Sequence, residues 1–161
     1  MQDIINRLRA KKDDEGFTLI ELLVVVVIIG VLVAIAVPVY LNYRQGAADK
    51  SAQSDVRGAV SAIEQYYTDN GNAYATLPSA TQTAGFNLGK ATADGTAINK
   101  VTLSDKTKMT YVGTASSYRV CATNTGGSGK VYLYDSTKGG SVTESKTVMS
   151  TNFDTCGPTT P

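Results

Sequence analysis

A single acidic side chain stands inside a long apolar run near the start of the chain. Glu21 is the only charged residue between Phe17 and Tyr43. A charge at the depth of a lipid bilayer costs roughly 3 kcal/mol on insertion scales, so such a residue is a candidate for function by default. The alternative is that Glu21 lies unpaired at the headgroup boundary and has no role.

The remaining residues offer little for catalysis. The chain has no histidine, which is the commonest general base and a frequent metal ligand. Without histidine a nucleophile–base pair would have to be Ser–Lys, and no motif singles one out. The sequence also has no dense acidic cluster near its C-terminus. We therefore expect no enzyme activity, no catalytic residue, no metal site and no cofactor.

Length and charge narrow the class of protein further. The 161 residues suffice for one domain of ordinary size, and the formal net charge is +1. A dedicated nucleic-acid binder usually carries a strongly basic face, so nucleic acid is not an expected main partner.

The apolar run around Glu21 is long enough to cross a membrane. A bilayer core about 30 Å thick needs about 20 apolar residues in a helix, and residues 17–43 exceed that length. Backbone groups in lipid must bond to one another, which makes the helix close to obligatory. Pro38 lies inside it and should kink it near residue 34. Basic residues are denser before the run than after it, which predicts a cytoplasmic N-terminus and an exported remainder.

The helical pattern continues beyond the apolar run. Apolar residues from Ala52 to Tyr67 recur at steps of three and four, so one helix is predicted from about Thr18 to about Thr68. Asp69-Asn70-Gly71 should end it, because glycine accepts the left-handed conformation of a helix cap. We predict strands near residues 101–103, 110–112, 118–121, 130–134 and 142–148, with residues 125–129 as a hairpin connection. The expected fold is α+β, with a small antiparallel sheet packed on the second half of the helix.

The two cysteines, Cys121 and Cys156, lie in the polar C-terminal part, behind the apolar run. Such a pair suits a disulfide in an oxidising compartment. Two unpaired thiols in a reducing cytoplasm are the alternative.

The string Gly16-Phe17-Thr18-Leu19-Ile20-Glu21, followed at once by the apolar run, resembles the N-terminal motif of type IV prepilins and of the related secretion-system pseudopilins. The resemblance is close over about residues 16–45, including Pro38, and looser through the amphipathic helix and the cysteine pair. A small residue, an aromatic residue and a lone glutamate in the fifth place of an uncharged span rarely coincide by chance.

This resemblance implies a precursor of the cytoplasmic membrane that ends in an extracellular filament. A prepilin peptidase would cut between Gly16 and Phe17 and N-methylate Phe17, and an assembly platform and an ATPase would drive self-association into the filament. Glu21 would pair with the Phe17 amine of a neighbouring subunit. The implied parts are a leader (residues 1–16), a transmembrane and filament-core half-helix (17–43) and a globular head (44–161).

Two other functions fit parts of the sequence. The chain could be a minor pilin or a pseudopilin acting in assembly or secretion, which abundance on the cell surface would separate from a major pilin. It could also be a secreted protein with an ordinary signal peptide, because Ala34-Ile35-Ala36 satisfies a small-x-small cleavage pattern. Glu21 inside the apolar run and the helical periodicity beyond it argue against a signal peptide.

Overall fold

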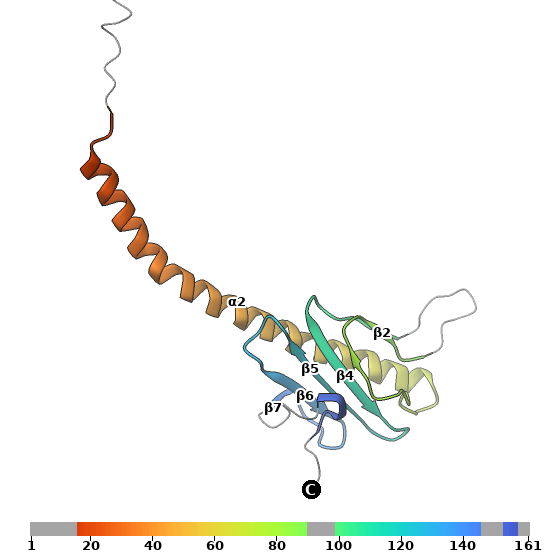
Figure 1. Cartoon of the computed structure of the whole chain (residues 1–161). Coiled ribbons are helices and arrows are strands. Elements are labelled where there is room, and N and C mark those ends of the chain that lie inside the picture. Colours follow the sequence, from red (N-terminus) through yellow and green to blue (C-terminus); the bar gives the residue numbers. More distant parts are fainter. Residues whose placement is uncertain (1–15, 90–98, 146–152, 158–161) are drawn as a thin grey trace, which may run out of the picture. The chain divides into compact units, whose positions relative to one another are not determined.

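The computed structural model describes residues 16–89, 99–145 and 153–157, and it shows an α+β chain (Figure 1). Within these ranges a long helix, α2 (Leu19–Asp69), precedes seven short strands and a 3-10 turn, η1 (Phe153–Thr155). This confirms the predicted fold class. The chain divides into two compact units, residues 1–40 and 41–161, and each unit is described by itself.

The helical part of the first unit is apolar and exposed. Its large side chains, from Leu19 to Tyr40, are each about half or more exposed, with Val37 at 49% and Leu19 at 90%. Among the described residues α2 is the one helix long and apolar enough to cross a membrane, judged by length and composition alone. The helix continues through Pro38 without a break. A kink at Pro38 stays a prediction.

In the second unit, α2 buries the predicted stripe. Ala52, Val56, Ala59 and Ile63 are fully buried and join the main apolar core. These positions lie three and four residues apart, which places them on one face of a helix. The helix therefore contributes one wall of the core of the head.

The helix ends as the sequence predicts. Gly71 takes a positive φ of 68°, and the Asn72 N–H donates to the Tyr67 carbonyl oxygen at 3.0 Å. This bond spans six residues and is typical of a Schellman motif, which satisfies a carbonyl group that the helix leaves unpaired.

The head contains one five-stranded antiparallel sheet and one small ribbon. The sheet has the order β1-β4-β5-β6-β7, and the ribbon pairs β2 with β3. The strands β4, β5, β6 and β7 are neighbours both in the chain and in the sheet, because short loops let consecutive antiparallel strands pair as hairpins. The strands are β1 (Thr81–Gln82), β2 (Phe86–Asn87), β3 (Lys100–Val101), β4 (Thr107–Gly113), β5 (Tyr118–Asn124), β6 (Val131–Asp135) and β7 (Thr143–Ser145).

The predicted strands are found, with shifted ends. The strand predicted at 101–103 is β3, which ends at Val101, and β4 and β5 are longer than expected. β7 is shorter than the predicted 142–148, of which residues 146–148 lie outside the described residues. The connection 125–129 does join an antiparallel pair. The sequence analysis missed β1 and β2, because two-residue strands carry too short an alternation to be recognised.

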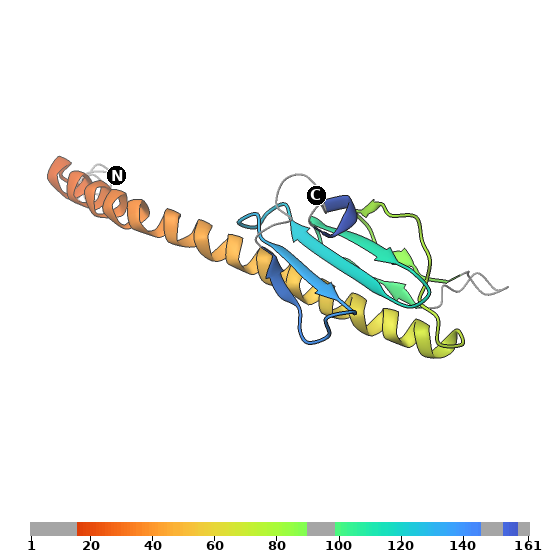
Figure 2. The ribbon, with the colours of Figure 1, turned by 90° about the horizontal axis from the view of Figure 1, so that it is seen from below.

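The two faces of the sheet are buried against different partners. Tyr118, Val120 and Ala122 of β5 belong to the core that includes α2, whereas Cys121, between them, packs with Val131 and Cys156 in a second cluster. Successive side chains of a strand point to opposite faces, so this second cluster lies on the face away from α2. In Figure 2 the dark blue η1 lies on that side of the strands.

A disulfide joins this second face to the C-terminal segment. Cys121 and Cys156 are bonded, their Cα atoms are 5.5 Å apart, and both side chains are fully buried. This confirms the predicted pairing. Asp154 adds to the attachment, since the Thr81 hydroxyl donates to its carboxylate at 2.5 Å and the Ser79 hydroxyl donates to its backbone oxygen.

Removing the disulfide should strongly destabilise the head. The cross-link spans a sequence separation of 35 residues, and loop-closure entropy for a loop of that size is worth roughly 4 kcal/mol. We expect the double variant Cys121→Ala/Cys156→Ala to lose about that much in urea unfolding of the full chain in detergent. The reduced parent chain is the control, because its sulfur atoms still fill the buried site. Equal unfolding midpoints for oxidised and reduced parent would contradict the expectation.

Two carboxylates of α2 each accept two hydrogen bonds from a serine in a loop of the head. Asp49, only 5% exposed, accepts bonds from the Ser128 N–H at 3.0 Å and the Ser128 hydroxyl at 2.5 Å. Asp55, which is more exposed, accepts the same two bonds from Ser104, at 2.9 and 2.8 Å. The first pair ties the β5–β6 connection to the helix, and the second ties the loop between β3 and β4.

The buried pair should matter more than the exposed one. In Asp49→Ala the Ser128 N–H and hydroxyl would be left in a site that water reaches poorly, which costs about 3 kcal/mol of the free energy of unfolding. In Asp55→Ala, water can replace the carboxylate, and we expect a loss of about 1 kcal/mol. Urea unfolding of the two variants side by side makes the comparison. Equal losses would show that burial does not set the difference.

Tyrosine hydroxyls at the interface of helix and sheet should make the head sensitive to alkali. Burial raises the pKa of Tyr111 to about 12, from an ordinary value of 10.0. Burial also raises the pKa of Tyr118, whose hydroxyl donates to Glu64 at 2.7 Å. The folded chain holds protons that the unfolded chain releases. The stability that these groups contribute is therefore complete below about pH 10 and declines as the pH rises above 10; for Tyr111 the loss is complete by about pH 12.

We expect the free energy of unfolding to be flat between about pH 7 and pH 9 and to fall above about pH 10. Tyr118→Phe should reduce the alkaline slope, because the variant has no phenol at this position to ionise. An unchanged slope in Tyr118→Phe would contradict the assignment.

Candidate functional site at the start of the apolar helix

The backbone changes conformation three residues after Gly16. Gly16, Phe17 and Thr18 are exposed and non-helical, and α2 begins at Leu19. The Thr18 carbonyl oxygen accepts the first bond of the helix, from the Leu22 N–H at 3.2 Å. Thr18 is therefore the N-cap residue, and the Gly16–Phe17 peptide bond lies outside the helix.

Thr18 and Glu21 cap the helix reciprocally. The Glu21 N–H donates to the Thr18 hydroxyl oxygen at 3.2 Å, and the Thr18 N–H donates to Oε2 of Glu21 at 2.8 Å. The Thr18 hydroxyl also donates to the same Oε2, at 2.8 Å. This is a capping box, which satisfies two backbone donors that a helix start leaves unpaired. The Thr-x-x-Glu spacing before an apolar run is its sequence signature, and the sequence analysis passed over it.

Both bonds from Thr18 reach the same carboxylate oxygen, Oε2, and Oε1 of Glu21 has no hydrogen bond to any of the described residues. Glu21 is thus only partly occupied by the described residues: Oε2 caps its own helix, and Oε1 has no partner among them. An acceptor of this kind suits an amine.

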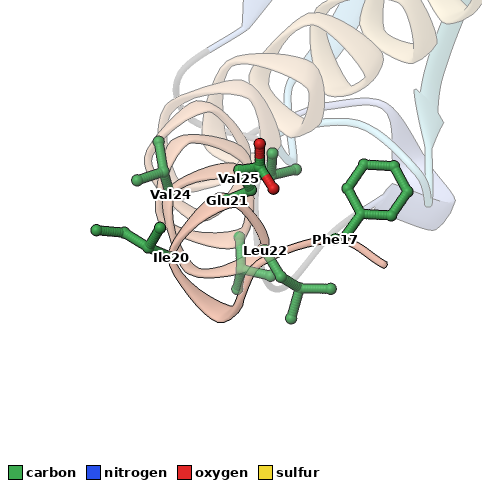
Figure 3. A pocket seen from close by; sticks show the side chains of 7 residues that line it. Phe17, Ile20, Glu21, Leu22, Val24 and Val25 are labelled. Carbon is green, nitrogen blue, oxygen red and sulfur yellow. The ribbon is translucent and has the colours of Figure 1, made fainter. Parts of the chain in front are cut away.

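Phe17 and Glu21 lie on the same open apolar groove. Figure 3 shows the Phe17 ring set to one side of the first turn, with Glu21 and apolar side chains of the helix beside it. The groove has a volume of about 630 Å³, and Glu21 is the only charged one among the described residues that line it; the others are Phe17, Ile20, Leu22, Val24, Val25 and Val26. A single carboxylate on such a surface is costly to transfer into an apolar environment without a partner.

The other predicted residues lie elsewhere. Pro38 is within α2, and the Cys121–Cys156 disulfide is in the head, so neither belongs to this groove. Among the described residues no group of three or more acidic or cysteine side chains is arranged to hold a metal ion. The site contains no nucleophile activated by a base, and what its geometry offers is an exposed peptide bond and a half-occupied carboxylate.

Comparison with known proteins agrees with this site. Residues 11–37 match the family described as "Prokaryotic N-terminal methylation motif". The chain is 37% identical over 94 residues to the fimbrial protein EcpC of Eikenella corrodens, which covers 58% of this chain and 57% of that protein. It is 42% identical over 57 residues to the type IV major pilin protein PilE1 of Neisseria gonorrhoeae, covering 35% and 34%.

A secretion protein is also similar. The type II secretion system core protein G of Escherichia coli K12 is 40% identical over 63 residues, covering 39% of this chain and 43% of that protein. The matched segments thus span from about a third to somewhat over half of the relatives' length. No solved structure matches the chain.

Proposed function

We propose that this chain, a member of the type IV pilin and pseudopilin family by its N-terminal motif and its relatives, is the precursor of a structural pilus subunit. The observation that carries the proposal is the first turn of α2. An exposed, non-helical Gly16–Phe17 bond is followed by an apolar run whose single carboxylate, that of Glu21, has one oxygen without a bond to the described residues. Such a segment suits cutting by a peptidase and then burial against copies of itself.

In this proposal the chain passes through two environments. The precursor lies in the cytoplasmic membrane, with residues 1–16 as the leader on the cytoplasmic side. A prepilin peptidase cuts after Gly16 and methylates the new amine of Phe17. The assembly platform and its ATPase then move the subunit into an extracellular filament. The chain itself supplies no catalysis.

The physical basis of assembly is the exposed apolar surface of residues 17–43. In the membrane this surface contacts lipid, and outside the membrane it must be covered. Copies of the same helix can cover it, and the amine of one Phe17 can occupy the available oxygen of a neighbouring Glu21. Pairing an amine with a carboxylate removes two charges that would be costly to leave alone in an apolar core.

We favour a major pilin over a pseudopilin. The longest of the matches described above is to a fimbrial protein, and it extends well beyond the N-terminal helix. The match to the secretion protein is shorter.

Shearing filaments from cells and identifying their main protein tests this choice. We expect this chain to dominate the sheared fraction, and its deletion to abolish the filaments. A chain that stays in the envelope, with filaments intact and secretion of a substrate lost upon deletion, would assign it to the pseudopilins.

A further inference from the structure

We propose that Thr18 is a positioning residue for processing: by capping α2 it ends the helix short of the Gly16–Phe17 bond and keeps that bond open to the peptidase. The inference rests on the proposed function. It concerns a residue that neither forms the bond to be cut nor carries the charge used in assembly.

The position of the bond relative to the cap is the first step of the argument. Thr18 is the N-cap residue and α2 begins at Leu19, so the bond between Gly16 and Phe17 lies one residue before the cap. Peptidases act on extended backbone, because a helical peptide bond has its N–H and carbonyl groups occupied and its neighbours wrapped around it. A helix that continued one turn toward the N-terminus would enclose the Gly16–Phe17 bond.

The second step is that, among the described residues, only the cap fixes this boundary. Phe17 and Gly16 are exposed, so no tertiary packing holds them outside the helix. The next residues of α2 are apolar, and in lipid their backbone groups cannot give up their bonds. The start of the helix can therefore not recede into the membrane. Without the cap it can move only outward, toward Gly16.

The third step is that the hydroxyl of Thr18 makes the cap. It accepts from the Glu21 N–H at 3.2 Å and donates to Glu21 Oε2 at 2.8 Å. Loss of an N-cap side chain changes the helix-boundary equilibrium by about fivefold. The population with an extended Gly16–Phe17 bond should fall by a similar factor.

The experiment measures the initial rate of cleavage of full-length variants in membranes that contain the prepilin peptidase. Thr18→Val keeps the shape of the side chain and removes the hydroxyl, and its rate should fall about fivefold. Thr18→Ser and Thr18→Asn both retain a capping oxygen and should be cut at nearly the parent rate. Asparagine is the more informative, because it caps with a group of different shape.

Amide hydrogen exchange of the same full-length variants supplies a readout of the boundary itself. In the parent the first bond of the helix comes from the Leu22 N–H, so the N–H groups of Leu19 and Ile20 precede it. In Thr18→Val these two N–H groups should exchange more slowly than in the parent, since a helix extended by one turn places a carbonyl group four residues before each of them.

Two results would overturn the inference. One is Thr18→Val cut at the parent rate or faster. The other is Thr18→Asn cut as slowly as Thr18→Val, which would mean that the peptidase contacts the threonine directly. A parent chain that is not cut after Gly16 would instead remove the proposed function, so the two failures are distinguishable.

Discussion

Gly16→Leu should leave the whole precursor uncut in the membrane and abolish filaments. Gly16 lies in the exposed, non-helical segment next to the bond to be broken. Without a side chain it lets the backbone approach a protease cleft closely, and leucine fills that space. The mass of the membrane-bound protein measures the outcome, which should be that of a chain that still carries residues 1–16.

Gly16→Ala is the matched control for this experiment. It adds one methyl group, so we expect slowed cutting and fewer filaments, not their complete loss. Normal maturation of Gly16→Leu would contradict the prepilin interpretation of this segment.

Glu21→Val should be cut normally yet assemble poorly. The valine variant retains the Thr18 hydroxyl and the backbone N–H of residue 21, so the main cap of α2 persists and the Gly16–Phe17 bond stays outside the helix. What is lost is the carboxylate. At about 4 Å an amine and a carboxylate attract by about 4 kcal/mol at an effective dielectric constant near 20, and desolvation offsets part of this.

The larger effect should be on the register between subunits. A subunit one step out of place would leave an amine and a carboxylate unpaired in an apolar core, and that costs more than the correct pair gains. We therefore expect very few filaments from Glu21→Val, and few mixed filaments when it is co-expressed with the parent chain. Electron microscopy and the yield of sheared filaments measure both.

The capping box makes a sharper control possible. Glu21→Gln can still accept the two bonds that Thr18 donates, but it carries no charge. If the charge directs assembly, the glutamine variant should fail like the valine variant. Normal filaments from Glu21→Gln would show that Glu21 acts through the cap alone, and the pairing mechanism would be wrong while the family assignment stood.

The sequence predicted those parts of the fold that periodicity controls. The helix was placed within one residue at each end, because its apolar stripe is long and Gly71 ends it with a left-handed cap. The ribbon of β2 and β3 and the edge strand β1 were missed, since two-residue strands depend on tertiary pairing.

The contacts that tie the head together were less predictable. The bonds that Ser128 donates to Asp49 and that Ser104 donates to Asp55 join residues that lie 79 and 49 positions apart. No local pattern marks such a pair, because an aspartate in a polar helix face is typical of a solvated surface. The cysteine pair was predictable for the opposite reason, since only two cysteines exist.

Within the candidate site, the sequence marks Glu21 as the lone charge of an apolar run, whereas the roles of Gly16 and Phe17 are implied by the resemblance to prepilins. Thr18 was overlooked although Thr18-Leu19-Ile20-Glu21 has the form of a capping box before an apolar run. Glu21 combines two features: it is a charge inside an apolar run, and it accepts a hydrogen bond from Thr18 within the first turn of its own helix.

The mass and sequence of the N-terminus of the protein collected from the cell surface test the central claim most directly. Our account predicts a chain that begins at Phe17 with one methyl group on its amine, and that contains Glu21 and the rest of α2. A chain that begins at Val37, after the Ala34-Ile35-Ala36 pattern, would contradict it, because the helix proposed to form the filament core would then have been discarded as a signal peptide.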